Sequence, residues 1–88
     1  MVREPLTHEQ LLAGQRLGSL IRTARAGRDP GVVARAAGIS PETLRKIEVG
    51  RMPSPGFGTI VGVCEALSIP VQEAVDVWRG AYDSEPAR

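Results

Sequence analysis

A pair of residues that starts a helix, an N-cap residue followed by proline, occurs twice within thirteen positions of this chain. Asp29–Pro30 and Ser40–Pro41 each combine an N-cap side chain with a proline, and Gly38 lies just before the second pair. The cap oxygen accepts hydrogen bonds from the free amides of the first turn, where proline's missing amide is not needed. Gly38 can adopt the left-handed conformation that ends a helix. The pattern therefore predicts two short helices, over residues 30–37 and 41–49, joined by a tight turn.

The rest of the chain also has helical rather than strand spacing of its apolar residues. Thr7 and Gln10 form a capping box that predicts a helix from near His8, ending at Gly27, with Gly14 and Gly18 weakening its first turns. Further helices are predicted from Phe57 to Leu67 and from Pro70 onwards, the last of them carrying Val71, Ala74, Val75, Trp78 and Tyr82. The prediction is an all-α domain of five helices.

The length of 88 residues fits one domain. Residues 1–16 are interpreted as an N-terminal extension with the start of the first helix, residues 17–82 as the folded domain, and residues 83–88 as a loose tail. The single cysteine, Cys64, cannot form a disulfide within the chain and is expected in the core. No apolar run approaches the roughly 20 residues that span a membrane. These features favour a cytoplasmic protein.

Charge is distributed unevenly along the chain. Between Arg22 and Arg51 there are seven basic and three acidic residues, a net charge of +4, whereas the remainder carries −3. A basic middle with acidic flanks favours one face that binds an anion, although an ordinary solvated surface remains an alternative.

Residues 30–49 meet the requirements of a helix-turn-helix. Ala34 is small where the second helix of the pair would cross, and apolar residues occupy the positions that face the core, namely Val33, Ala37, Ile39, Leu44 and Ile47. Together with LGSLIRTAR (17–25) and IEVGR (47–51), this stretch resembles the lambda-repressor-like, Xre-type (Cro/C1-type) helix-turn-helix family over residues 17–75. The resemblance implies a five-helix fold and a transcriptional regulator, most often a repressor, that binds double-stranded DNA. It also implies an ion pair between Arg25 and Glu48.

A recognition helix presents its N-terminal residues to base edges in the major groove. The candidates for base contact are therefore Pro41, Glu42, Thr43 and Lys46. Glu42 could instead complement the helix dipole, and Lys46 could contact phosphate or solvent. The candidates for phosphate contact are Ser40, Arg45, Arg51, Arg35 and Arg28.

Two departures from the family pattern bear on this interpretation. Pro30 lies where family members usually carry a glutamine that holds the DNA backbone, and Pro41 and Glu42 occupy the first two base-reading positions. Proline has no donor, and glutamate accepts from cytosine N4 but repels phosphate.

A homodimer is expected through one face of the last helix, formed by Val71, Val75, Trp78 and Tyr82, although these residues could simply close the core. Two other functions stay open. The chain could be an antitoxin or another interaction module with a protein partner, such as a toxin or a polymerase subunit. Alternatively, the fold could have lost DNA binding. An enzyme is disfavoured because one histidine, His8, and one cysteine provide no acid–base or nucleophile–base pair, and no cofactor or metal is expected.

Overall fold

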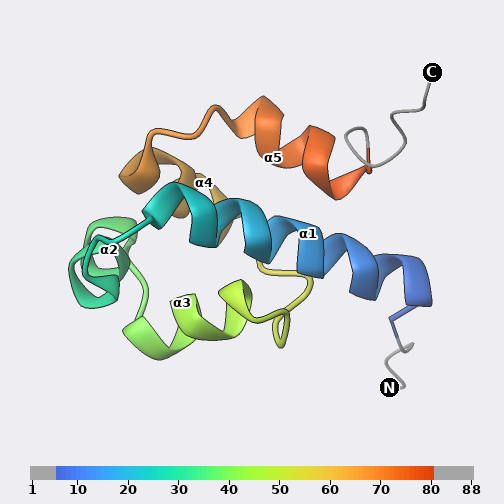
Figure 1. The fold of residues 1–88 in the computed structure, drawn as a ribbon, viewed down its shortest axis with the longest axis horizontal. Coiled ribbons are helices and arrows are strands. Elements are labelled where there is room, and N and C mark those ends of the chain that lie inside the picture. The colour runs from blue at the N-terminus through green and yellow to red at the C-terminus, as the bar shows by residue number, and fades with distance from the viewer. Residues whose placement is uncertain (1–5, 81–88) are drawn as a thin grey trace.

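The computed structural model describes residues 6–80, and these residues form five α-helices and no strand (Figure 1). The helices are α1 (His8–Arg25), α2 (Pro30–Ala37), α3 (Pro41–Glu48), α4 (Phe57–Leu67) and α5 (Val71–Trp78). The all-α, five-helix prediction is confirmed. Tyr82, the proposed tail and residues 1–5 lie outside the described residues.

The first three helices begin where their caps predict. Thr7 and Gln10 form the complete capping box, with the Gln10 amide donating to Thr7 Oγ1 at 3.0 Å and the Thr7 amide donating to Gln10 Oε1 at 2.9 Å. The Asp29 carboxylate accepts from the Val32 amide at 3.1 Å and caps α2. Because these hydrogen bonds satisfy the free amides without any tertiary contact, the start of the helix can be predicted from the sequence.

Gly38 makes the turn between α2 and α3. Its φ of 80° is left-handed, and the amides of Gly38 and Ile39 donate back to the carbonyls of Arg35 and Ala34 at 3.1 and 3.0 Å. This pattern ends a helix while satisfying its last carbonyls, and a side chain at the turning residue would be strained. The tight turn predicted from Gly38 is therefore present.

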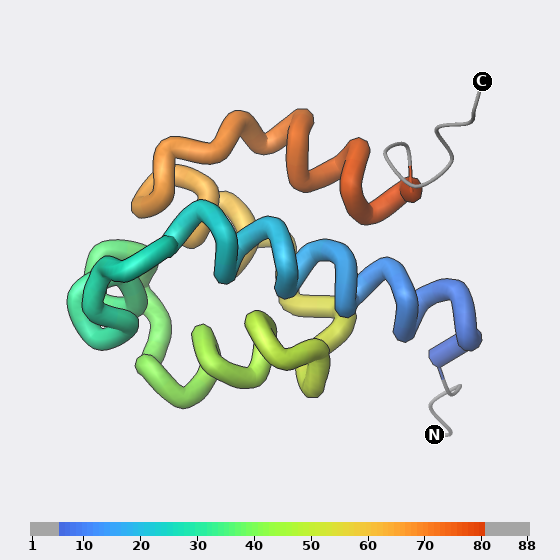
Figure 2. The backbone as a smooth tube through the Cα atoms, in the orientation of Figure 1, coloured from blue at the N-terminus to red at the C-terminus, as the bar shows by residue number. Residues whose placement is uncertain are grey.

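Helix α1 crosses the middle of the molecule, with α3 packed on one side and α5 on the other (Figure 1). Helix α2 packs against α3 and α4 at the C-terminal end of α1, and the first turns of α1 extend past the end of α3 (Figure 2). The core lies where these helices meet, and its largest fully buried side chains are Ile21, Leu44, Ile47 and Val63. Cys64 lies in this core, as expected.

Glycines on α1 have a role that the sequence did not reveal. Gly18 is buried, and a Cβ atom there would overlap the carbonyl oxygen of Ile47 at the end of α3. A Cβ atom on Gly14 would likewise overlap Pro53 in the following loop. The two glycines thus allow α3 and its loop to approach α1 closely, a gain that accompanies their cost in helix propensity.

An arginine on α1 holds α5 in place. Arg16 donates from Nε to the Val77 carbonyl at 2.9 Å and from Nη2 to the Trp78 carbonyl at 2.8 Å. The last carbonyls of a helix have no partner within the helix, and a cation beside them also offsets the helix dipole. This contact fixes the C-terminal end of α5 against α1.

Two helix ends differ from the predictions. Helix α1 ends at Arg25, and the residue with positive φ (53°) is Ala26 rather than Gly27. Helix α5 begins after Pro70 and ends at Trp78, followed by Gly80 with a φ of 80°, so the prediction that α5 continues to Tyr82 is wrong. A left-handed glycine ends a helix efficiently, which accounts for the shorter α5.

Candidate nucleic-acid interface

Helices α2 and α3 form a rigid pair because their facing residues are fully buried. Ala34 on α2 and both Leu44 and Ile47 on α3 have relative exposures of 0%. Ala34 is the small residue expected where the helices cross, and the two larger side chains fill the core behind α3. The opposite side of α3 is consequently left to solvent and can meet a partner.

That outward side of α3 carries most of the candidate base-contacting residues. Pro41, Glu42 and Arg45 are exposed, whereas Thr43 and Lys46 are half-buried. Arg51 is exposed just beyond α3, and its amide donates to the Lys46 carbonyl at 2.8 Å. We call the set of Pro41, Glu42, Thr43, Arg45, Lys46 and Arg51 the α3 surface. It has three basic side chains and one acidic side chain.

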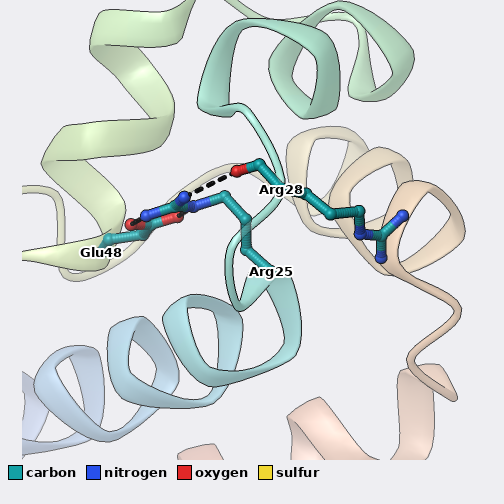
Figure 3. Close-up of polar contacts among 3 residues, drawn as sticks. All are labelled: Arg25, Arg28 and Glu48. Carbon is teal, nitrogen blue, oxygen red and sulfur yellow. Dashed lines mark hydrogen bonds and ion pairs between the residues drawn. The ribbon is translucent and has the colours of Figure 1, made fainter.

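The orientation of α3 is restrained by an ion pair with α1. Arg25 donates from Nε to Glu48 Oε2 at 2.7 Å and from Nη2 to Oε1 at 2.9 Å, and its Nη1 donates to the Arg28 carbonyl at 2.9 Å (Figure 3). The exposed fractions of the two side chains are 17% and 7%. The hydrogen bonds to Glu48 raise the pKa of Arg25, although burial opposes this effect. A bidentate pair restrains angle as well as distance.

Arg28 takes part in this arrangement only through its backbone. Its side chain is exposed and points away from the Arg25–Glu48 pair (Figure 3). The Arg28 guanidinium therefore takes no part in the ion pair, and its contact with phosphate stays a prediction. Arg35 is also exposed, on α2.

The hydroxyl groups at the start of α3 form a short chain. Ser40 Oγ accepts from the Thr43 amide at 3.0 Å and donates to Thr43 Oγ1 at 2.9 Å. The hydrogen of Ser40 is thus used within the first turn, while the Thr43 hydroxyl keeps its hydrogen for an external acceptor. Thr43 is therefore better placed than Ser40 to donate from its hydroxyl, and the phosphate contact of Ser40 stays a prediction.

The start of α2 is unsuited to anion binding. Helix N-termini usually attract anions through free amides and the helix dipole. Here the Asp29 carboxylate already occupies the Val32 amide, and Pro30 has no amide hydrogen. A phosphate at the start of α2 would meet the negative charge of Asp29, which disfavours a phosphate contact at this point.

The proposed dimer face lies on α4 and α5, and α5 is on the opposite side of α1 from α3 (Figure 1). Val71 is exposed and Val75 and Trp78 are half-buried; together with Phe57 and Ile60 of α4 they line an apolar groove of about 360 Å³. Phe57 keeps the helical spacing of the other apolar residues of α4, yet it is 76% exposed. It is the first residue of the helix, and periodicity alone does not show whether a helix end is covered.

No helix among residues 6–80 is long and apolar enough to cross a membrane. The same part of the chain contains no group of three or more histidine, cysteine or acidic residues placed to hold a metal ion.

Two short helices joined by a tight turn, with a basic outward surface on the second, define the helix-turn-helix class of DNA-binding domains. Residues 16–77 match a family model described as a helix-turn-helix domain, and the chain belongs to this family. A search of curated proteins found no match to the chain. DNA is the partner that this family assignment supports, with a regulatory and typically non-enzymatic role.

Proposed function

We propose that this protein is a transcriptional repressor of the lambda-repressor-like, Xre type that binds operator DNA with α3 in the major groove. The observation that carries the proposal is the α3 surface: an outward helix face with three basic side chains, held at a fixed angle by Arg25 and Glu48. A repressor of this kind acts on chromosomal DNA in the cytoplasm and lowers transcription by covering a promoter.

The residues of the α3 surface divide by position. Glu42, Thr43 and Lys46 contact base edges, and Pro41 makes an apolar contact beside them. Lysine suits guanine O6 and N7, and the free Thr43 hydrogen suits an acceptor. Arg45, Arg51 and Arg35 contact phosphates, and Ser40 acts by holding the Thr43 hydroxyl. Arg28, which is exposed between α1 and α2, is a further candidate for phosphate contact outside the α3 surface.

The protein acts as a homodimer in this proposal. The apolar groove of Phe57, Ile60, Val71, Val75 and Trp78 lies on α4 and α5 and is the surface through which two copies would pack. To read two half-sites, such a pair has to hold its two copies of α3 about 34 Å apart, one turn of DNA. Binding of two half-sites at once would then give the dimer a higher affinity than either protomer has alone, and the operator would be palindromic.

A second candidate function is a protein-interaction module, such as an antitoxin, in which DNA binding is secondary. The observation that favours it is the acidic start of α2, where the Asp29 carboxylate accepts from the Val32 amide and places a negative charge at the helix N-terminus. Its partner, a toxin or a polymerase subunit, would use the groove between α4 and α5 or the exposed leucines Leu11 and Leu12 of α1.

The proposal is tested by selecting binding sites from fragmented genomic DNA at about 150 mM salt, because non-specific phosphate contacts weaken steeply with salt. The wild type is compared with an Arg45→Ala, Lys46→Ala double variant. An Arg22→Ala variant is the control for loss of positive charge, since Arg22 is exposed on α1, outside both the α3 surface and the groove of α4 and α5.

Enrichment of one palindromic site by the wild type and by the control, but not by the double variant, is the expected result. Equal and weak binding of all fragments by all three proteins would contradict the proposal and favour the interaction module.

A further inference from the structure

A cavity between the starts of α2 and α3 opens beside the α3 surface. It has a volume of about 290 Å³, and its walls include Pro30 from α2 and both Pro41 and Leu44 from α3. Glu42 and Arg45 line it as well. The two prolines that depart from the family pattern therefore build one apolar hollow, which has room for a methyl group.

Glu42 is the carboxylate at this hollow that is available to a ligand. The other acidic residue there, Glu48, is bonded through both oxygens to Arg25. Glu42 is exposed, and within residues 6–80 its carboxylate has no hydrogen-bond or ion-pair partner. The site thus offers a strong acceptor directly beside an apolar hollow, in the first turn of α3.

Only one base edge of the major groove matches this pair of features. Thymine has a C5 methyl group but presents the O4 acceptor, which a carboxylate repels, and adenine presents an acceptor beside its amine. Cytosine presents the N4 donor without a methyl group. A cytosine methylated at C5 presents the N4 donor and a methyl group next to it.

We propose that the site formed by Glu42, Pro30 and Pro41 recognises 5-methylcytosine at one position of each half-site. Glu42 accepts a hydrogen bond from N4, and the C5 methyl group enters the hollow between the two prolines. This inference rests on the proposed function, because it requires the start of α3 to face base edges. It assigns a ligand to the residues that fit ordinary family recognition least well.

The test uses the full chain and two random-sequence duplex libraries, one made with cytosine and one with 5-methylcytosine. Duplexes of the best site from each library are then made with cytosine, 5-methylcytosine or thymine at each position in turn, and the affinity of the protein for each duplex is measured. Burial of one methyl group corresponds to about fourfold tighter binding of the methylated site. A well-formed pair between side chain and base corresponds to about five- to hundredfold discrimination against thymine.

Variants separate the two halves of the site. Glu42→Gln can accept from cytosine or donate to thymine, so its preference between these bases should fall to about twofold or less. Glu65→Gln, an equal charge change at an exposed position of α4, is its control and should keep the full preference. Pro30→Ala shortens the wall of the hollow and should lose the methyl preference while keeping cytosine over thymine. Melting curves verify that each variant is folded.

Tighter binding of the methylated site, with these variant effects, supports the inference. The inference is overturned, and the repressor proposal left intact, if the selected site has no cytosine at the position whose base preference depends on Glu42. Equal affinity for the methylated and unmethylated forms of the site has the same meaning. No selected site from either library overturns both.

Discussion

The ion pair behind α3 gives a quantitative prediction. Replacing Glu48 with alanine removes both acceptors of the bidentate pair and leaves Arg25 with only the Arg28 carbonyl among its described partners. The exposed fractions of 17% and 7% show that water has limited access to the site. The stranded guanidinium is therefore only partly rehydrated, and the orientation of α3 loses its main polar restraint to α1.

The magnitude follows from this intermediate burial. Breaking a fully buried pair costs about 3–5 kcal/mol, whereas exposed pairs contribute about 0–1 kcal/mol. We expect Glu48→Ala to lower the free energy of unfolding by about 2–3 kcal/mol. At about 4–8 °C for each kcal/mol in a domain of this size, the melting temperature should fall by about 10–20 °C.

The assay is urea denaturation followed by the fluorescence of Trp78, the only tryptophan, which packs against the core. A double-mutant cycle with Arg25→Ala isolates the coupling between the two side chains. Arg25→Ala should cost more than Glu48→Ala because it also removes the bond to the Arg28 carbonyl. Glu65→Ala, an exposed acid on α4, is the control and should change stability by less than about 0.5 kcal/mol.

A coupling energy below about 0.5 kcal/mol would refute this reasoning, since the pair would then behave like an ordinary exposed salt bridge. A cost for Arg25→Ala no greater than that for Glu48→Ala would refute the separate contribution of the Arg28 carbonyl.

Two further predictions concern α1 and the core. Gly18→Ala places a Cβ atom against the Ile47 carbonyl and should lower the free energy of unfolding by about 1–3 kcal/mol. Gly58→Ala, whose Cβ meets nothing within 4 Å, should raise it by about 0.5–1 kcal/mol. Urea denaturation measures both changes, and equal effects of the two variants would contradict the close approach of α3 to α1. Burial and then the charge of Glu73 raise the pKa of Cys64, so above about pH 9 the thiol ionises first in the unfolded state and stability falls with pH. Cys64→Ala should lose less stability between about pH 7 and pH 10 than the wild type does, and parallel pH profiles of the two proteins would count against this effect.

The starts of α1, α2 and α3 could be predicted because their signals are local. Thr7, Asp29 and Ser40 accept from amides three residues away, whatever the rest of the chain does. The turn at Gly38 is local for the same reason. Apolar spacing then identified the core faces of α2 and α3, since a helix exposes the same side throughout.

Features that depend on distant parts of the chain could not be predicted. From the sequence, Gly18 is expected only to weaken its helix, because the close approach of Ile47 is a tertiary contact. The hydrogen bonds of Arg16 to the end of α5 are likewise tertiary and have no local signal. The spacing of Phe57 fits a buried stripe, but burial depends on which helix lies opposite. Likewise, Pro30 and Pro41 look like unrelated departures until the fold brings them to one hollow.

The central claim is that the α3 surface binds DNA. The most direct measurement is an NMR titration of the labelled full chain with duplex DNA, following the backbone amides at about 150 mM salt. The account predicts that shifts concentrate in residues 40–51, with smaller changes near residues 29–31 and almost none in α5. Shifts confined to the groove of α4 and α5, or no shifts with any duplex, would contradict it.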